Sequence, residues 1–284
     1  MTDLPLISVI MNCHNSEEFL REAIDSVLNQ TYKYFEVIFW DNCSTDHSAA
    51  IVKSYNDNRI KYYYASQKAT LGHARNLAIS KSNGEIIAFL DCDDLWDNNW
   101  LEVMSNEFSN DDELSFLFCR FAVFGNRKEK LVKRVSIEDS IIDLDSFIDN
   151  YTVGMSGACF RKSVLKDGNI SFSNTYNLIE DYDFFIRIAS YGKVKYLVHP
   201  YMHYRLHGNN LTDKSSSWTM ELKDMRAKVE RKERSYEHLQ NHMQAINRQI
   251  RGYEFHDMIV EKKYFKALIT RPVASFLYIF SKCR

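Results

Sequence analysis

The feature that most constrains this chain is a regular alternation of apolar runs and helical patterns over its first ninety residues. The apolar runs are short and rich in β-branched and aromatic side chains, as buried strands are. They span residues 6–11, 35–40, 60–65 and 86–90, with helical spacing of apolar residues between them. Strands that alternate with helices through short connections are typical of a mainly parallel sheet with helices on both faces. We therefore expect an α/β fold.

Polar clusters follow three of these strands directly, at residues 12–15, 41–46 and 91–94. In open parallel sheets, ligands bind beyond the carboxyl ends of the strands. The three clusters are therefore predicted to converge on one edge of the sheet and to form a ligand site. Within the first cluster, Asn15 and Glu18 have the spacing of a capping box at the start of a helix.

The rest of the chain is less regular. Residues 114–124 and 194–198 have the apolar character of strands, and residues 183–191 that of a helix. Residues 218–249 are highly charged and contain no glycine or proline, which predicts one extended helix packed on the domain.

Composition excludes some classes of protein. The formal net charge is -2, so we expect no nucleic-acid partner. None of the six cysteines forms a C-x-x-C pair, which favours reduced thiols in a cytosolic protein over a zinc site or disulfides. The amino terminus lacks the pattern of a signal peptide, and no apolar run has the roughly 18 residues of a spanning helix. We expect a cytoplasmic location.

The acidic cluster is the first candidate for chemistry. Asp91, Asp93 and Asp94 follow the strand at 86–90, and carboxylates this close repel one another unless a cation compensates. Mg²⁺ or Mn²⁺ with phosphate oxygens would suit them, but a helix cap or a solvated turn would also explain them. Asp41 is a turn residue, a helix cap or an acceptor for a donor group on a nucleotide base.

Two further groups have a chemical and a structural interpretation. Glu180 and Asp181 precede a helical pattern, so they either cap that helix or supply a general base. His203, Arg205 and His207 alternate and would share one face of a strand. His207 either binds metal or phosphate or is a structural histidine.

Two segments together resemble the family 2 glycosyltransferases of the GT-A fold: "ISVIMNCHNSEEFLREAIDSVLNQTYKYFEVIFWDNCSTD" and "GHARNLAISKSNGEIIAFLDCDDLW". The resemblance covers about residues 6–210. It implies a Rossmann-like mixed, mainly parallel sheet flanked by helices, with a C-terminal helical extension. The implied catalytic domain is 1–212, with a nucleotide-sugar half at about 1–100 and an acceptor half at about 101–212. The extension is 213–284.

The resemblance also assigns roles at the metal and diphosphate. Asp91, Cys92 and Asp93 match the D-x-D motif of the donor site, whose last carboxylate typically meets the metal. His207 in "YRLHGNNLT" matches a histidine near the diphosphate or metal. The implied metal ligands are therefore Asp93, Asp91 and His207, and the implied cofactor is Mn²⁺ or Mg²⁺.

The nucleotide contacts are implied in the same way. Asp41 matches the acid that recognises the base, commonly uracil, and Asn15 matches the loop that lies along the nucleotide. Arg75 in "GHARN" matches a basic residue on the donor side. His14 replaces a common tyrosine beside Asn15, and residues 42–43 replace a common Asp-Gly, which leaves the base preference open.

Asp181 matches the proposed catalytic base of the family, with Glu180 beside it. The implied activity is inverting transfer of a hexosyl or N-acetylhexosaminyl group from a nucleotide sugar, which we expect to be a UDP-sugar. The expected acceptor is a hydroxyl of a glycan or lipid-linked acceptor in cell-surface polysaccharide synthesis.

Three alternatives differ in their sequence requirements. A non-catalytic nucleotide-binding scaffold of the same fold would not need Asp91, Asp93 and Asp181 together. A nucleotidyltransferase would carry a glycine-rich phosphate loop after the first strand, and a dinucleotide oxidoreductase would carry G-x-G-x-x-G there. "MNCHNSEEF" contains no glycine.

The C-terminal segment, residues 262–284, is basic and apolar, with six basic and no acidic residues. Such a segment can lie on an anionic membrane surface, which would place the protein peripherally on the inner face of the membrane. It can equally pack on the catalytic domain or on a second subunit.

Overall fold

The computed structural model describes residues 4–125, 130–131, 138–207 and 218–260. Its strands are β1 Ile7–Cys13, β2 Phe35–Asp41, β3 Ile60–Tyr64, β4 Ile86–Phe89, β5 Leu95–Trp96, β6 Leu114–Gly125, β7 Lys130–Leu131, β8 Ser140–Ile142, β9 Ala158–Arg161 and β10 Lys193–Leu206. Its α-helices are α1 Leu20–Leu28, α2 Ser48–Lys53, α3 Leu71–Ser80, α4 Trp100–Asn110, α5 Leu144–Asp149, α6 Ser163–Asp167, α7 Glu180–Ala189, α8 Thr219–Glu230 and α9 Met243–Val260. Two 3-10 helices are η1 Met155–Gly157 and η3 Arg234–His242.

The described strands form one mixed sheet in the order β3-β2-β1-β4-β9-β6-β10-β5, with β7 beside β6 and β8 beside β10. β1 pairs in parallel with both β2 and β4, and β2 pairs in parallel with β3. β9 is antiparallel to both of its neighbours, β4 and β6. The predicted fold class, a mainly parallel mixed sheet flanked by helices with a C-terminal helical extension, is confirmed.

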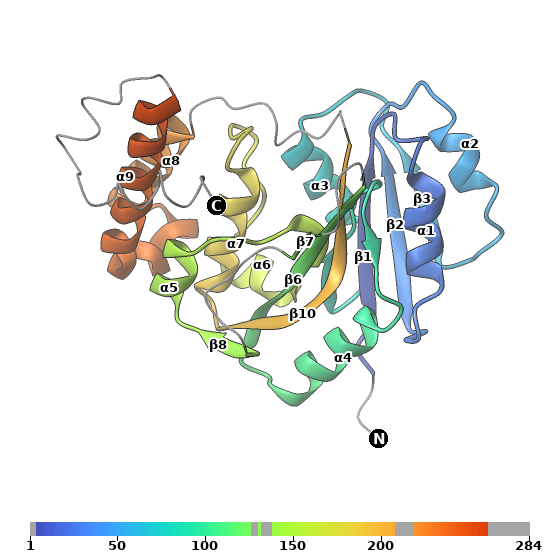
Figure 1. The fold of residues 1–284 in the computed structure, drawn as a ribbon, viewed down its shortest axis with the longest axis horizontal. Coiled ribbons are helices and arrows are strands. Elements are labelled where there is room, and N and C mark those ends of the chain that lie inside the picture. The colour runs from blue at the N-terminus through green and yellow to red at the C-terminus, as the bar shows by residue number, and fades with distance from the viewer. Residues whose placement is uncertain (1–3, 126–129, 132–137, 208–217, 261–284) are drawn as a thin grey trace.

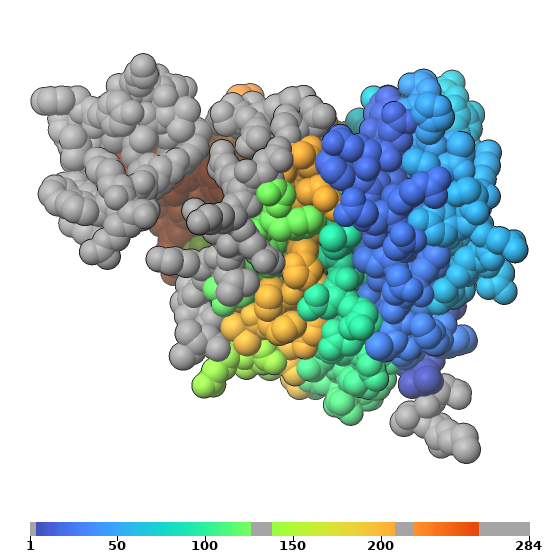
Figure 2. All heavy atoms as spheres, turned by 45° about the vertical axis from the view of Figure 1, so that its right-hand side comes forward, coloured from blue at the N-terminus to red at the C-terminus, as the bar shows by residue number. Residues whose placement is uncertain are grey.

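Helices cover both faces of the sheet, which explains why its central strands are apolar throughout instead of alternating. Buried residues of α1, α2 and α4 form one core with one face, and those of α3, α5, α7, α8 and α9 form the other core. Figure 1 shows α8 and α9 at the end of the molecule away from β1–β3, beside α5 and α7. In the space-filling view, β10 lies beside the N-terminal half of the chain (Figure 2).

Two local predictions are wrong. The capping box at Asn15 does not form: α1 begins at Leu20 with Phe19 as its N-cap, and no side chain caps it. The Asn15 side chain is occupied elsewhere, because its Oδ1 accepts a hydrogen bond from Thr45 N at 2.8 Å. A residue with φ of 55° also lies outside the usual N-cap conformation.

The predicted extended helix over 218–249 is also wrong, since the chain forms α8, η3 and α9 instead. Lys232 takes a φ of 58° and turns the chain between α8 and η3. A single helix of that length would run roughly 48 Å. The turn instead lets Tyr236 and Leu239 of η3 join the same core as α7. None of the described helices has both the length and the apolar character needed to cross a membrane.

A buried carboxylate, Glu36 on β2, ties together the N-terminal strands. It accepts hydrogen bonds from Ser8 Oγ at 2.7 Å and from Asn83 N at 2.5 Å, and it pairs with Lys61 of β3. Gly84 is required beside this cluster, since a Cβ there would lie 2.6 Å from Ser8 N. Burial opposes ionisation of Glu36, but these partners overcome that effect and lower its pKa to about 2.

Replacing Glu36 with glutamine should therefore destabilise the protein in a pH-dependent way. A carboxyl whose pKa is lowered on folding stabilises fully above its unfolded value of 4.5 and loses that contribution as the pH falls toward 2. We expect Glu36→Gln to reduce the free energy of unfolding by about 3 kcal/mol at pH 7 and by about half of that at pH 3. Urea denaturation at both pH values measures this, with the exposed Glu113→Gln as a control. An equal loss at both pH values would contradict the account.

Candidate functional site

The loops that follow β1 and β2 interlock at the carboxyl edge of the sheet, as the sequence predicted. Asn15 N donates to Ser44 Oγ at 3.1 Å, which adds to the bond between Asn15 and Thr45. Asn42 makes two bonds to the backbone of Ala69, at 2.9 Å each, and so fixes the segment before α3. Asn15 therefore shapes this loop through its own side chain. Its contact with a nucleotide stays a prediction.

Asp41 lies at the end of β2 and is fully buried. Its Oδ1 accepts from Ser44 N at 2.7 Å and its Oδ2 accepts from Tyr62 OH at 2.7 Å. Each carboxylate oxygen keeps a further lone pair, but with no exposed surface the side chain could contact a base only after the loop moved. In this structure the side chain organises the loop, and its role in recognising the base stays a prediction.

The acidic turn after β4 is held from below by Ser156 of η1. Ser156 Oγ donates to Asp94 Oδ2 at 2.6 Å and accepts from Asp91 N at 3.0 Å. Asp94 Oδ1 also accepts from Arg205 N of β10 at 3.0 Å. Asp94 is buried and structural, and its bonds join β4, η1 and β10 beneath the site.

Asp93 meets His207 at the end of β10. The distance from Asp93 Oδ2 to His207 Nε2 is 2.9 Å, and both side chains are partly exposed. Arg205 holds the same turn, because its Nε donates to Asp93 O at 2.8 Å and its guanidinium stacks on Phe19 at 4.4 Å. The sequence prediction that these β10 residues face one side is consistent with these contacts.

Asp91 turns toward Arg75 of α3 instead. Arg75 Nη2 lies 3.8 Å from Asp91 Oδ1, and Arg75 Nη1 donates to Glu180 Oε1 at 3.2 Å. Only 6% of the Arg75 side chain is exposed. Burial raises the pKa of Asp91 to about 6; Arg75 opposes this rise, and the charges of Asp93 and Asp181 add to it.

Glu180 and Asp181 lie in the first turn of α7, which begins three residues before the predicted start at residue 183. Burial raises the pKa of Glu180 to about 7; Arg75 opposes this, and the charge of Asp181 adds to it. Burial likewise raises the pKa of Asp181, whose Oδ2 accepts a 3.3 Å hydrogen bond from Tyr151 OH. Asp181 is partly buried, so it is accessible as well as raised in pKa, which is the state that a general base needs near neutral pH.

Cys92, the middle residue of the acidic motif, points into the protein. Its Sγ donates to Asn12 O at 3.4 Å, and it lies against Cys13 in the core on the α1 face. Unless the side chain moves, only the backbone of Cys92 could therefore contact a nucleotide-sugar donor. The five cysteines within the described residues carry free thiols: Cys13, Cys43, Cys92, Cys119 and Cys159.

The predicted three-residue metal set is only partly assembled. Asp93 and His207 touch, but Asp91 is directed to Arg75, and no three His, Cys, Asp or Glu side chains in the described ranges form a metal-binding group. A hard divalent ion that shares phosphate oxygens needs only one or two protein carboxylates. The donor set of Asp93 and His207 therefore fits Mn²⁺ or Mg²⁺ bound together with a diphosphate.

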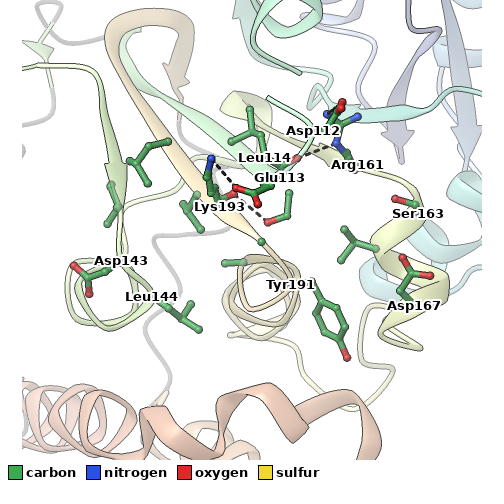
Figure 3. Close-up of a pocket in the computed structure, with 17 residues that line it drawn as sticks. Asp112, Glu113, Leu114, Asp143, Leu144, Arg161, Ser163, Asp167, Tyr191 and Lys193 are labelled. Atoms are coloured by element: carbon green, nitrogen blue, oxygen red, sulfur yellow. Dashed lines mark hydrogen bonds and ion pairs between the residues drawn. The ribbon is translucent and has the colours of Figure 1, made fainter. Parts of the chain in front are cut away.

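A separate cavity of about 630 Å³ lies under the opposite, amino-terminal end of β6 and β10 (Figure 3). Its cations are already paired: Lys193 Nζ lies 2.8 Å from Glu113 Oε2, and Arg161 donates to backbone oxygens of Phe108 and Asp111. None of the predicted site residues lines it.

Comparison with known proteins agrees with this geometry. The sequence model of glycosyl transferase family 2 matches residues 8–168. The chain belongs to this family. TuaG of Bacillus subtilis, a glycosyltransferase named for teichuronic acid biosynthesis, is 31% identical over 152 residues, 53% of this chain and 60% of TuaG. WfgD of Escherichia coli, named as a glucosyltransferase acting on GlcNAc-diphosphoundecaprenol, is 31% identical over 186 residues, 60% of this chain and 73% of WfgD.

Solved structures show the same fold. The S. aureus TarS fragment in complex with UDP-GlcNAc has a TM-score of 0.68 at 22% identity, covering 78% of this chain and 66% of that one. The Pyrobaculum calidifontis mannosyltransferase PcManGT, in complex with GDP-Man and Mn²⁺, has a TM-score of 0.64 at 17% identity, covering 99% and 81%. The family 2 glycosyltransferase of GT-A fold that the sequence indicated is confirmed. This family member spans 60% of TuaG and about two thirds of the TarS fragment.

Sequence reasoning missed two residues of this family 2 site. Ser156 hydrogen-bonds to the acidic turn after β4, and Tyr151 hydrogen-bonds to Asp181. Both residues come from the irregular segment before β9. Gly154 and Gly157 indicated a turn around Ser156, but they gave no indication of which residues Ser156 contacts. Only the fold brings these residues to the edge of the sheet.

Removing Arg75 should destabilise the site more at high pH. Its guanidinium opposes the rise in pKa of Glu180, so without it the ionised carboxylate is buried unpaired. We expect Arg75→Met to cost about 3 kcal/mol of unfolding free energy at pH 8 and clearly less at pH 5, where Glu180 is protonated. Thermal unfolding at the two pH values measures this. The exposed Arg231→Met serves as the control, and a loss independent of pH would count against the pairing.

Proposed function

We propose that this protein is an inverting glycosyltransferase that uses a nucleotide sugar, with a donor site at the carboxyl edge of β1, β2 and β4. The observation that carries the proposal is the placement of two acidic groups around one buried cation. Arg75 contacts both Asp91 of the donor-side motif and Glu180 of the acceptor-side helix. A nucleotide-sugar donor beside Asp91 and a general base at the start of α7 would thus lie a short distance apart, as a single displacement requires.

Asp93 and His207 are proposed to hold a divalent ion at the diphosphate, with Asp91 beside them. When bound, Mn²⁺ or Mg²⁺ supplies charge stabilisation to a departing nucleoside diphosphate. Asn15, Asp41 and the Cys92 backbone are proposed to border the nucleotide. These roles rest on the position of each residue at the sheet edge and on the family motif.

Asp181 is proposed to take the proton from the attacking acceptor hydroxyl. Burial raises its pKa, which favours proton uptake, and Tyr151 OH holds one carboxylate oxygen while the Tyr182 amide donates to the other at 2.7 Å. The hydroxyl then attacks the anomeric carbon on the face opposite the diphosphate, and one displacement inverts the configuration. Glu180 stays paired with Arg75 and keeps that cation in place.

The donor is proposed to be a UDP-sugar carrying a hexose or an N-acetylhexosamine. TarS was solved with UDP-GlcNAc and WfgD is named for UDP-Glc, whereas PcManGT was solved with GDP-Man. The acceptor is proposed to be a glycan or lipid-linked acceptor of cell-surface polysaccharide synthesis, at the cytoplasmic side of the membrane. The basic segment at 262–284, which would contact the membrane surface, lies outside the described residues.

A panel of UDP-, GDP- and dTDP-sugars tests the donor site directly. We expect one donor to release nucleoside diphosphate with Mn²⁺ or Mg²⁺ and not with EDTA. Asp93→Asn should weaken metal-dependent nucleotide binding by at least about tenfold in calorimetry, because it removes one of the two available ligands. The exposed Asp112→Asn is the control. If nucleotide binds but no donor is hydrolysed, the non-catalytic nucleotide-binding scaffold replaces the enzyme proposal. If no nucleotide binds, the proposed donor site is refuted as well.

Asp181→Asn should separate catalysis from folding. We expect transfer to fall by at least about a thousandfold, since the general base is lost, while donor affinity stays within twofold. The melting temperature should not fall, because asparagine removes an ionisable group whose raised pKa opposes folding at neutral pH. Transfer assays, calorimetry and thermal unfolding measure the three effects, with the exposed Asp167→Asn as the control. Normal turnover by Asp181→Asn would remove it from the catalytic role.

A further inference from the structure

The C-terminal helices make specific polar contacts with the segment that leads into α7, in addition to apolar packing. Glu221, in the first turn of α8, directs its carboxylate at three consecutive backbone amides. Its Oε1 accepts from Asn177 N at 3.1 Å, and its Oε2 accepts from Leu178 N at 3.0 Å and Ile179 N at 3.1 Å. These are the residues immediately before Glu180, where α7 begins.

The start of α7 has no cap of its own. Its N-cap residue is Ile179, whose side chain has no acceptor, and no side-chain cap bond is made there. The first turn already carries Glu180, Asp181 and Asp183, so a fourth carboxylate nearby is unfavourable by charge alone. The three amide bonds to Glu221 offset that repulsion. They also fix the backbone two residues before Asp181.

Two further bonds attach the same extension to α7 and its lead-in. Tyr236 OH of η3 donates to Asp183 Oδ1 at 2.7 Å in the buried interior, where Asp183 also pairs with Arg187. Tyr176 OH donates to Asp224 Oδ2 of α8 at 2.8 Å. Burial raises the pKa of Tyr253 in α9 to about 12, and the charge of Asp181 adds to this rise. The extension therefore contacts both the lead-in and the first turns of the helix that carries the proposed base.

We propose that the C-terminal helices form part of the catalytic unit and that Glu221 is a positioning residue for Asp181. Glu221 contacts neither donor nor acceptor in this account. It fixes the lead-in of α7, and through it the direction of the Asp181 carboxylate, which Tyr151 meets from α5's side of the site. This inference rests on the proposed role of Asp181 as the base. It makes the extension necessary for the rate of transfer and unnecessary for donor binding.

Hydrogen–deuterium exchange on the full chain tests the contact without any activity assay. In Glu221→Ala, the amides of residues 177–179 lose their acceptor and should exchange at least about tenfold faster than in the parent. Glu221→Gln should fall between the two, because one amide oxygen can still accept while its NH₂ group faces a backbone donor. Glu230→Gln, which alters the exposed Arg226 pair on the same helix, should leave these amides unchanged. Unchanged exchange in Glu221→Ala would overturn the proposal whatever the enzyme does.

Kinetics then separate positioning from stability. We expect kcat for transfer to fall at least about tenfold in Glu221→Ala, with partial rescue in Glu221→Gln and an unchanged dissociation constant for UDP. Tyr236→Phe removes another bond between the extension and α7, farther along that helix, and serves as the control for a loss of stability. It should retain kcat.

A fall in kcat that follows the melting temperature equally in Glu221→Ala and Tyr236→Phe would overturn the positioning role. Absence of transfer by the parent protein with every donor would instead refute the proposed function, and the exchange data would still decide whether Glu221 holds the lead-in.

Discussion

The buried guanidinium of Arg75 is the interaction on which the arrangement of this site depends. Burial raises the pKa values of Asp91, Glu180 and Asp181, and the charge of Asp181 adds to the rise at Asp91 and Glu180. Such a group would not remain ionised without a cation. Arg75 comes from α3, which packs against β1 and β2, and its guanidinium contacts an acid on each side of the site. One side chain thereby joins the donor-side turn to the acceptor-side helix.

The elements around Arg75 follow from the order of the strands. β1, β2 and β4 are parallel neighbours, so their trailing loops meet at one edge. β10 then crosses to the same edge and delivers Arg205 and His207 to the acidic turn. Arg205 reaches back to Glu22 on α1 at 2.7 Å, which secures the two halves of the chain to each other. The site is thus a product of sheet topology as much as of its motifs.

Much of this could be predicted from the sequence because the first ninety residues carry strong local signals. Each apolar run became a strand within about two residues, and Asp91, Asp93 and Asp181 stand where strand ends and helix starts were expected. What could not be predicted depends on contacts between distant segments. Asn15 had a capping pattern, but its side chain satisfies a loop thirty residues away. The charged stretch after residue 218 lacked any glycine or proline, yet its chain turns at Lys232 to bury apolar residues against α7. The predicted division near residue 212 stays a prediction, although the helices on both sides of it share one core.

The most direct test of the central claim is a crystal structure of the protein with UDP and Mn²⁺. We expect the ion against Asp93 and His207, the diphosphate beside it at the carboxyl edge of β1 and β4, and an open approach from the nucleotide toward Asp181. Nucleotide bound in the cavity under the amino-terminal end of β6 and β10, or an ion bound away from Asp93, would contradict it.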